Sequence, residues 1–316
     1  MNIKIVLLVI LTLCGLCNCV ENAINQNQTS LKIAQLKLLT PEQNPRKALL
    51  DLLELCNIKH DGSVKDIIEK TQHAWLCTPG TERWQPDSPE KISLLIVLPS
   101  LEKLGMLQEV TPSHKEYDYV LIFGAATGRV RDRLTYLIHL WDQGTRFKKI
   151  VLLGSERPLD PTVDSEAMLK NIPQYGLPTR KNWQIPAVLP KTESAMMRMI
   201  FDQVEIPDDM KKCPLIVVNS PQVTMPDGKI RRATTADTVI DWLKMNPQPG
   251  SCLFISNQPY VGYQHAIVLF LLPQSFTIDT AGSGVRDVST LAVNVCLDTL
   301  ARWLYQEYNK TPKCLY

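Results

Sequence analysis

Apolar runs alternate with amphipathic segments through the second half of the chain. The runs are rich in branched and aromatic residues, which is typical of strands covered on both faces. After the run at 119–123, apolar residues recur at helical spacing from Val130 to Trp141. This alternation predicts an α/β fold, a Rossmann-like three-layer sandwich with a mostly parallel sheet, over residues 116–316. The expected strands are 119–123, 149–153, 185–189 (an edge strand), 214–218, 251–256 and 276–279, and the expected helices are 130–141, 164–171, 192–201, 235–245, 262–272 and 289–308.

The N-terminal region, residues 23–115, shows mainly helical periodicity from residue 31 onward. Residues 45–55 are amphipathic, and Ser63 is placed to cap a second helix at 64–73. The apolar stretch 91–104 is interrupted by Pro99, which leaves its type open. The sequence therefore predicts a helical N-terminal extension to the α/β domain.

Residues 1–22 have the pattern of a targeting segment. Lys4 precedes an apolar run shorter than a bilayer span, and small or polar residues follow. This predicts a signal peptide cleaved between Cys17 and Ala23. A lipidated cysteine and an uncleaved anchor are the alternatives. We expect a secreted or periplasmic protein that touches a membrane only through an uncleaved or lipidated N-terminus.

Composition narrows the classes of partner and of site. The net charge of +2 gives no reason to expect nucleic acid. Three of the nine cysteines lie in the predicted signal. The other six are widely and irregularly spaced, and the sequence contains no HExxH motif. Both observations argue against a metal site. Sequence proximity suggests disulfides Cys56–Cys77 and Cys296–Cys314. Cys213 and Cys252 border strands and could instead be buried thiols.

The first strand leads into the segment Gly124-Ala-Ala-Thr-Gly-Arg129 and then into a basic helix. Gly124 and Gly128 permit a sharp turn and close approach of a ligand. The helix N-terminus, Thr127, Arg129 and Arg133 would together attract an anion. The spacing matches neither a dinucleotide fingerprint nor a P-loop. The alternative is a tight strand–helix turn with solvated arginines.

Small or polar residues follow three further strands. In a parallel sheet, these loops meet at the carboxyl edge, where ligands bind. Carboxylates and amides there could hold the polar part of a ligand. His265 is either a general base or a satisfied core histidine, and no nucleophile stands out. The candidate ligand-binding residues are Gly154, Ser155, Glu156, Glu166, Asn257 and Tyr260, with Asn219 and Gln258 as further amides.

The order of these features resembles the family called domain of unknown function 218, the YdcF-like proteins. The resemblance covers roughly residues 118–285. It implies a Rossmann-like fold with a nucleotide or adenosyl ligand and an envelope-related role. Tyr260 and Tyr263 stand where the family has His and Arg, and Thr192 alone is kept of its Asn-Thr motif. The matching segments are Val120-Leu-Ile-Phe-Gly124, the helix arginine Arg133, Val151-Leu-Leu-Gly-Ser-Glu156 with Ser165-Glu166-Ala167, and Leu253-Phe-Ile-Ser-Asn257.

Two functions follow from the sequence. In the first, an exported α/β protein binds a small anionic or nucleotide-like ligand at the carboxyl edge of its sheet, as a hydrolase or transferase of open reaction or as a binding protein. In the second, it is a non-enzymatic secreted or envelope interaction protein with a degenerate site. The sequence identifies neither cofactor nor oligomeric state.

Overall fold

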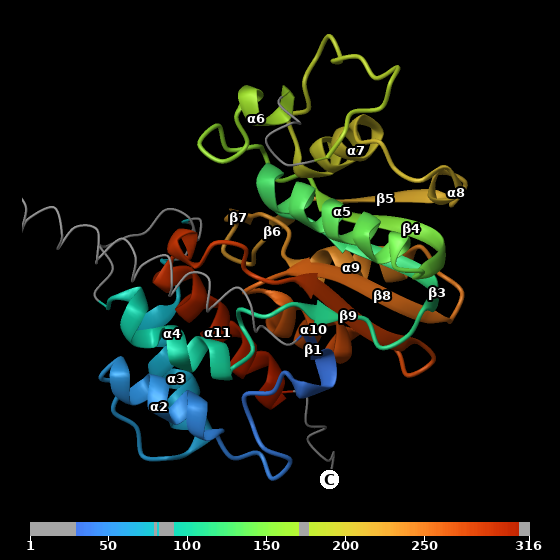
Figure 1. The fold of residues 1–316 in the computed structure, drawn as a ribbon. Coiled ribbons are helices and arrows are strands. Elements are labelled where there is room, and N and C mark those ends of the chain that lie inside the picture. The colour runs from blue at the N-terminus through green and yellow to red at the C-terminus, as the bar shows by residue number, and fades with distance from the viewer. Residues whose placement is uncertain (1–29, 79–80, 82–91, 171–176, 310–316) are drawn as a thin grey trace, which may run out of the picture. The chain divides into compact units, whose positions relative to one another are not determined.

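A seven-stranded sheet runs through the computed structural model, which describes residues 30–78, 81, 92–170 and 177–309. The strand order is β1-β2-β9-β8-β3-β4-β5, and every neighbouring pair is parallel except β2 with β9 (Figure 1). The predicted α/β sandwich with a mostly parallel sheet is confirmed. The strands are β1 (Leu31–Lys32), β2 (Val110–Thr111), β3 (Glu116–Phe123), β4 (Arg146–Ser155), β5 (Leu215–Ser220), β8 (Ser251–Asn257) and β9 (Thr277–Ser283).

The strand order reverses beside β3. The chain passes from β3 through β4 to β5 in one direction, then returns to place β8 and β9 on the other side of β3. In open α/β sheets, ligands bind at the carboxyl ends of the strands near such a reversal. The reversal between β3 and β8 therefore locates the region in which to look for a site.

Helices cover both faces of the sheet, which is why β3 is apolar along most of its length. Val120 and Ile122 pack under α5 (Thr127–Asp142) and α7 (Glu193–Gln203). Leu121 and Phe123 point to the opposite face, under α9 (Thr235–Lys244) and α10 (Val261–Leu271). The alternation of side chains along a strand assigns these residues to opposite cores. The short α6 (Glu166–Lys170) follows β4 on the α5 side.

The predicted N-terminal helices are α2 (Lys47–Leu55), α3 (Val64–Trp75) and α4 (Leu94–Lys103). They share one core with α10 and the closing helix α11 (Val293–Asn309). Because α10 lies between the sheet and this core, it is apolar on nearly all sides. Pro99 lies within α4, so residues 94–103 of the stretch left open by the sequence are helical.

Other segments extend or depart from the prediction. The stretch between β5 and α9 forms a hairpin of β6 (Val223–Thr224) and β7 (Ile230–Arg231). The expected edge strand 185–189 is wrong: these residues form an irregular loop with Ile185 and Val188 exposed, and Pro186 offers no N–H to a ladder. Remaining short elements are α8 (Asp208–Lys211), η1 (Ile33–Gln35) and η3 (Val288–Thr290).

The predicted signal 1–22 lies outside the described residues, as does Cys314. Cys56 and Cys77 are free thiols, so the disulfide expected between them is wrong. Burial raises the pKa of Cys56 to about 11. No helix in the described ranges combines the length and apolar character needed to cross a membrane.

Candidate functional site

Arg133 joins the ends of the two strands at which the sheet order reverses. Its Nε donates to Oδ1 of Asn257 at 2.9 Å, and its Nη1 donates to the carbonyls of Phe123 and Gly124, each at 2.8 Å. The side chain is 1% exposed, and burial lowers its pKa to about 10. Arg133, expected from sequence to support a bound anion, thus holds β3 and β8 together from inside the protein.

The N-terminus of α5, expected to bind an anion, already holds a carboxylate of the protein. Oδ1 of Asp164 accepts from the backbone N–H of Thr127 at 2.7 Å and from its hydroxyl at 2.9 Å. Oδ2 of Asp164 lies 3.2 Å from Nη1 of Arg157. Asp164 therefore caps the helix, and the Thr127 N–H is not available to a ligand.

Gly124 and Gly154 make room for α7. A Cβ on Gly124 would lie 2.8 Å from Cδ of Glu193, and one on Gly154 would lie 2.7 Å from the Cα of Ser194. The hydroxyl of Ser155 donates to Oε2 of Glu193 at 2.6 Å. These strand-end residues were expected to approach a ligand, and in the structure they approach the first turn of α7.

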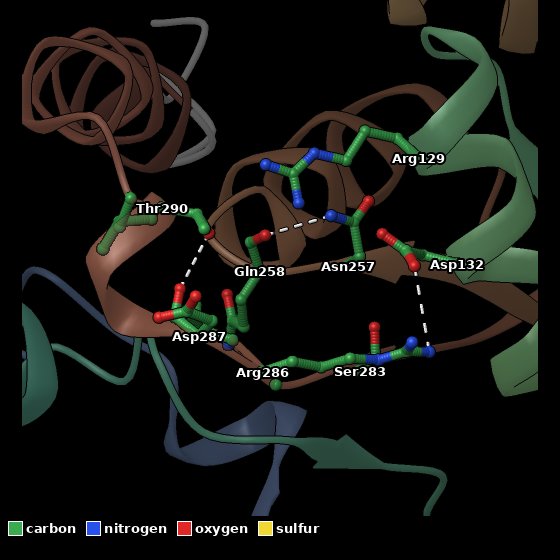
Figure 2. A pocket seen from close by; sticks show the side chains of 11 residues that line it. Arg129, Asp132, Asn257, Gln258, Ser283, Arg286, Asp287 and Thr290 are labelled. Carbon is green, nitrogen blue, oxygen red and sulfur yellow. Dashed lines mark hydrogen bonds and ion pairs between the residues drawn. The ribbon is translucent and has the colours of Figure 1, made fainter. Parts of the chain in front are cut away.

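A polar pocket opens beside the reversal, at the ends of β8 and β9 and the start of α5 (Figure 2). Its volume is about 140 Å³. Arg129 is half-buried, and in Figure 2 its guanidinium extends over Asn257 and Gln258. Within the described ranges, Arg129 forms no hydrogen bond or ion pair through its side chain. The polar lining residues are Arg129, Asp132, Asn257, Gln258, Ser283, Arg286, Asp287 and Thr290.

Asp132 lies one turn from Arg129 on the pocket side of α5. Its Oδ1 is 3.8 Å from Nη2 of Arg286, whose side chain is 61% exposed. Burial raises the pKa of Asp132, while Arg286 and Arg129 act in the opposite direction. The pocket thus has cationic and anionic groups on its rim, and Arg133 adds a buried positive charge behind Asn257.

The structure brings only some of the sequence candidates to this pocket. Arg129 and Asn257 line it, and Arg133 supports Asn257. Glu166 is exposed and paired with Lys170, at 2.8 Å, because α6 turns it to solvent. Glu156 is exposed next to Asn219, whose Nδ2 donates to it at 3.4 Å.

Two further residues proposed from the sequence, Tyr260 and His265, belong to α10 or its N-cap. Tyr260 is the N-cap residue of that helix, and its backbone N–H donates to the carbonyl of Asn257 at 3.0 Å. His265 is buried, with Nδ1 3.0 Å from the hydroxyl of Thr280. That contact fits the core-histidine alternative better than a general base.

Sequence reasoning missed the half of the pocket that follows β9. Ser283 is the last residue of β9, Arg286 and Asp287 lie just beyond it, and Asp132 lies between two arginines already considered. A signal was present, because Ser283-Gly284 ends a parallel strand as Gly154-Ser155 does. The expected strand stopped at residue 279, so the polar residues beyond it were not assigned to a strand end.

Fold and pocket define a Rossmann-like α/β protein with a small polar cavity at its switch point. The chain is similar to an uncharacterized protein of Mycobacterium bovis, with 25% identity over 210 residues, which covers 58% of this chain and 55% of the relative. Uncharacterized proteins from two strains of Mycobacterium tuberculosis match to the same extent. The chain spans about half the length of these curated relatives. No family model matches, and no solved structure matches.

Proposed function

We propose that the protein binds a small anionic ligand in the pocket between α5 and the ends of β8 and β9. The observation that carries the proposal is Arg129, a half-buried guanidinium at a polar cavity with no acceptor among the described residues. A guanidinium that the protein leaves unpaired suits a phosphate or carboxylate.

The surroundings of Arg129 favour an anion further. Asn257 is held by Arg133, so its side chain is fixed before a ligand arrives. Arg133 hydrogen-bonds only neutral oxygens among the described residues, and its positive charge is not neutralised by a hydrogen-bonded carboxylate. A buried cation in a medium of low dielectric attracts a nearby anion more strongly than a solvated one does.

The size of the pocket bears on the nucleotide-like ligand implied by the resemblance to domain of unknown function 218. A volume of about 140 Å³ is well below the roughly 300–1,000 Å³ of sites for drug-sized ligands. We therefore favour an anionic group with a small attached moiety over a whole nucleotide. Export of the protein rests on residues 1–22 and is part of the proposal.

The proposal is tested by thermal-shift and calorimetric titration with inorganic phosphate, with Arg129→Ala as the variant and Arg198→Ala as the matched control. Arg198 is an exposed arginine that pairs with Asp202 on α7. Binding to the native state must raise its stability, by about 2.7 kcal/mol at a ligand concentration of 100 Kd. We expect saturable stabilisation of wild type and of Arg198→Ala.

We expect Arg129→Ala to lose that stabilisation while it melts within about 1 °C of wild type, because an exposed or half-buried arginine without partners contributes little to folding. Absence of a shift in wild type with phosphate, sulfate and small carboxylates would refute ligand binding at this pocket. The interaction-protein alternative would then be preferred, and the search would turn to protein partners.

A further inference from the structure

Gln258, which lines the pocket, carries a buried acceptor without a donor among the described residues. Gln258 is 2% exposed, and its Nε2 donates to the carbonyls of Gly105 at 2.8 Å and Gln108 at 2.9 Å. Those two bonds fix the orientation of the amide, so its oxygen must act as an acceptor. Within the described part of the chain, Oε1 of Gln258 has no hydrogen-bond partner. Buried polar atoms in native proteins are nearly always satisfied, so this one calls for a donor.

A second acceptor of the pocket is the partly exposed carboxylate of Asp132. Asp132 is partly buried, and its contact with Arg286 at 3.8 Å is beyond hydrogen-bond length. Among the described residues, none donates a hydrogen bond to its carboxylate. Asp287, in contrast, already accepts from the backbone N–H and the hydroxyl of Ser289, at 2.9 and 2.6 Å. Among the described residues of the pocket, Oε1 of Gln258 and the carboxylate of Asp132 accept no hydrogen bond, and Asp287 is engaged only through its Oδ1.

The pocket is thus chemically asymmetric: within the described ranges, Arg129 is a cation without an acceptor, and Gln258 and Asp132 are acceptors without a donor. An inorganic anion would pair with Arg129 but would leave the two acceptors without a donor. We infer that the ligand is a polyol phosphate, whose phosphate meets Arg129 and whose hydroxyls donate to Gln258 Oε1 and to Asp132. This inference rests on the proposed anion site and adds the class of ligand that the site selects.

Two properties favour this class over near alternatives. The volume of about 140 Å³ suits a phosphate with a short carbon chain and excludes a base and ribose together. A phosphate monoester carries about 1.5 to 2 negative charges at neutral pH, more than a carboxylate does. With two arginines on the rim and Arg133 behind Asn257, the more highly charged anion gains more.

Calorimetric titration with glycerol 3-phosphate, propyl phosphate and glycerate separates the contributions. Propyl phosphate has the same charged group and chain length but no hydroxyls. We expect glycerol 3-phosphate to bind at least about tenfold more tightly than propyl phosphate, because hydrogen bonds to unsatisfied groups contribute that much. Glycerate should bind more weakly than glycerol 3-phosphate.

Asp132→Asn is expected to bring the ratio of the two phosphate affinities toward one while propyl phosphate still binds, since the substitution replaces an acceptor oxygen by an NH₂ donor and keeps the size of the side chain. Asp142→Asn, an exposed position on the same helix, should keep the wild-type ratio. Arg129→Ala should weaken all three ligands.

Each contrary result has one meaning. Equal affinities for glycerol 3-phosphate and propyl phosphate in wild type would overturn the polyol assignment and leave the anion site intact. An unchanged ratio in Asp132→Asn would overturn the recognition of hydroxyls by Asp132. If glycerate bound as tightly as glycerol 3-phosphate, the assignment of a phosphate group to the ligand would be overturned. Failure of every anion to bind would overturn the inference together with the proposed function.

Discussion

Nε of Arg133 donates to Oδ1 of Asn257 at 2.9 Å, across the point at which the strand order reverses. In folds of this kind, the crevice between the two central strands is where a ligand lies. Here a buried guanidinium from α5 fills part of that crevice and also binds the end of β3. The open pocket is accordingly found to one side, over the ends of β8 and β9.

Replacing the buried guanidinium should destabilise the fold. Arg133→Met would leave three oxygens, on Asn257, Phe123 and Gly124, without their donor. Each unsatisfied buried group costs roughly 1–3 kcal/mol, so we expect a loss of about 3–5 kcal/mol in the free energy of unfolding. Urea unfolding measures this, with Arg198→Met expected to change stability by less than about 0.5 kcal/mol. A stable Arg133→Met protein would show that these bonds contribute little.

Asp164 should matter to stability because it caps α5. In Asp164→Asn, an amide N–H would face the donors of Arg157 and Asp160, which now point at Oδ2. We expect a loss of about 2–4 kcal/mol, since a cap and a buried ion pair are both disturbed. Asp202→Asn, at an exposed ion pair, is the control and should lose less than about 1 kcal/mol. Similar melting temperatures for the two variants would contradict this account of the helix start.

Gly154 should tolerate no side chain. A Cβ there would lie 2.7 Å from the Cα of Ser194, which is backbone and cannot rotate away. We expect Gly154→Ala to destabilise the protein by about 1–3 kcal/mol through displacement of α7. Thermal unfolding measures the loss, and phosphate titration should show unchanged affinity in the folded fraction. A variant with normal stability and no phosphate binding would instead place Gly154 at a ligand.

Acid should weaken the amino-terminal edge of the sheet through Asp118. Hydrogen bonds from Lys148 and Ser251 hold the pKa of Asp118 at about 2, below its usual 3.8. Because the folded pKa is the lower one, the stabilisation is complete above about pH 4 and is lost as the pH falls toward about 2. Asp118→Asn should therefore lose less stability than wild type over that interval. Parallel stability curves from pH 5 to 2 would disprove this.

The free thiols predict insensitivity to reductant. Cys56 and Cys77 are not bonded to each other, and burial raises the pKa of both. We expect the same melting temperature with and without dithiothreitol, and slow alkylation of Cys56 at pH 8 because little thiolate is present. The melting temperature of the double variant Cys56→Ser/Cys77→Ser should likewise be the same with and without dithiothreitol. A drop of several degrees on reduction of wild type but not of the double variant would reveal a disulfide between them.

The sequence predicted what depends on local pattern. The run at 119–123 is apolar throughout, and the run at 251–256 is apolar from Cys252 to Ile255. Such continuous apolar runs arise when helices cover both faces of a sheet. The predicted edge strand at 185–189 is wrong because Pro186 offers no N–H to a ladder and Ile185 and Val188 remain exposed. Arg129 and Asn257 could be chosen from sequence because strand ends in a parallel sheet meet at one edge.

By itself, the sequence determined the alternation of strands and helices, and therefore the fold class and the edge of the sheet that carries polar loops. Only the tertiary structure decided which polar groups are already used. Asp164 reaches Thr127 across 37 positions and Arg133 reaches Asn257 across 124, and no local pattern encodes such pairings. From the sequence alone, an arginine that is already hydrogen-bonded therefore cannot be told from one that is open to a ligand. Packing satisfies Arg133, fills the space at Gly124 and leaves Arg129 free at the pocket among the described residues, because hydrogen bonding depends on distance in space rather than along the chain.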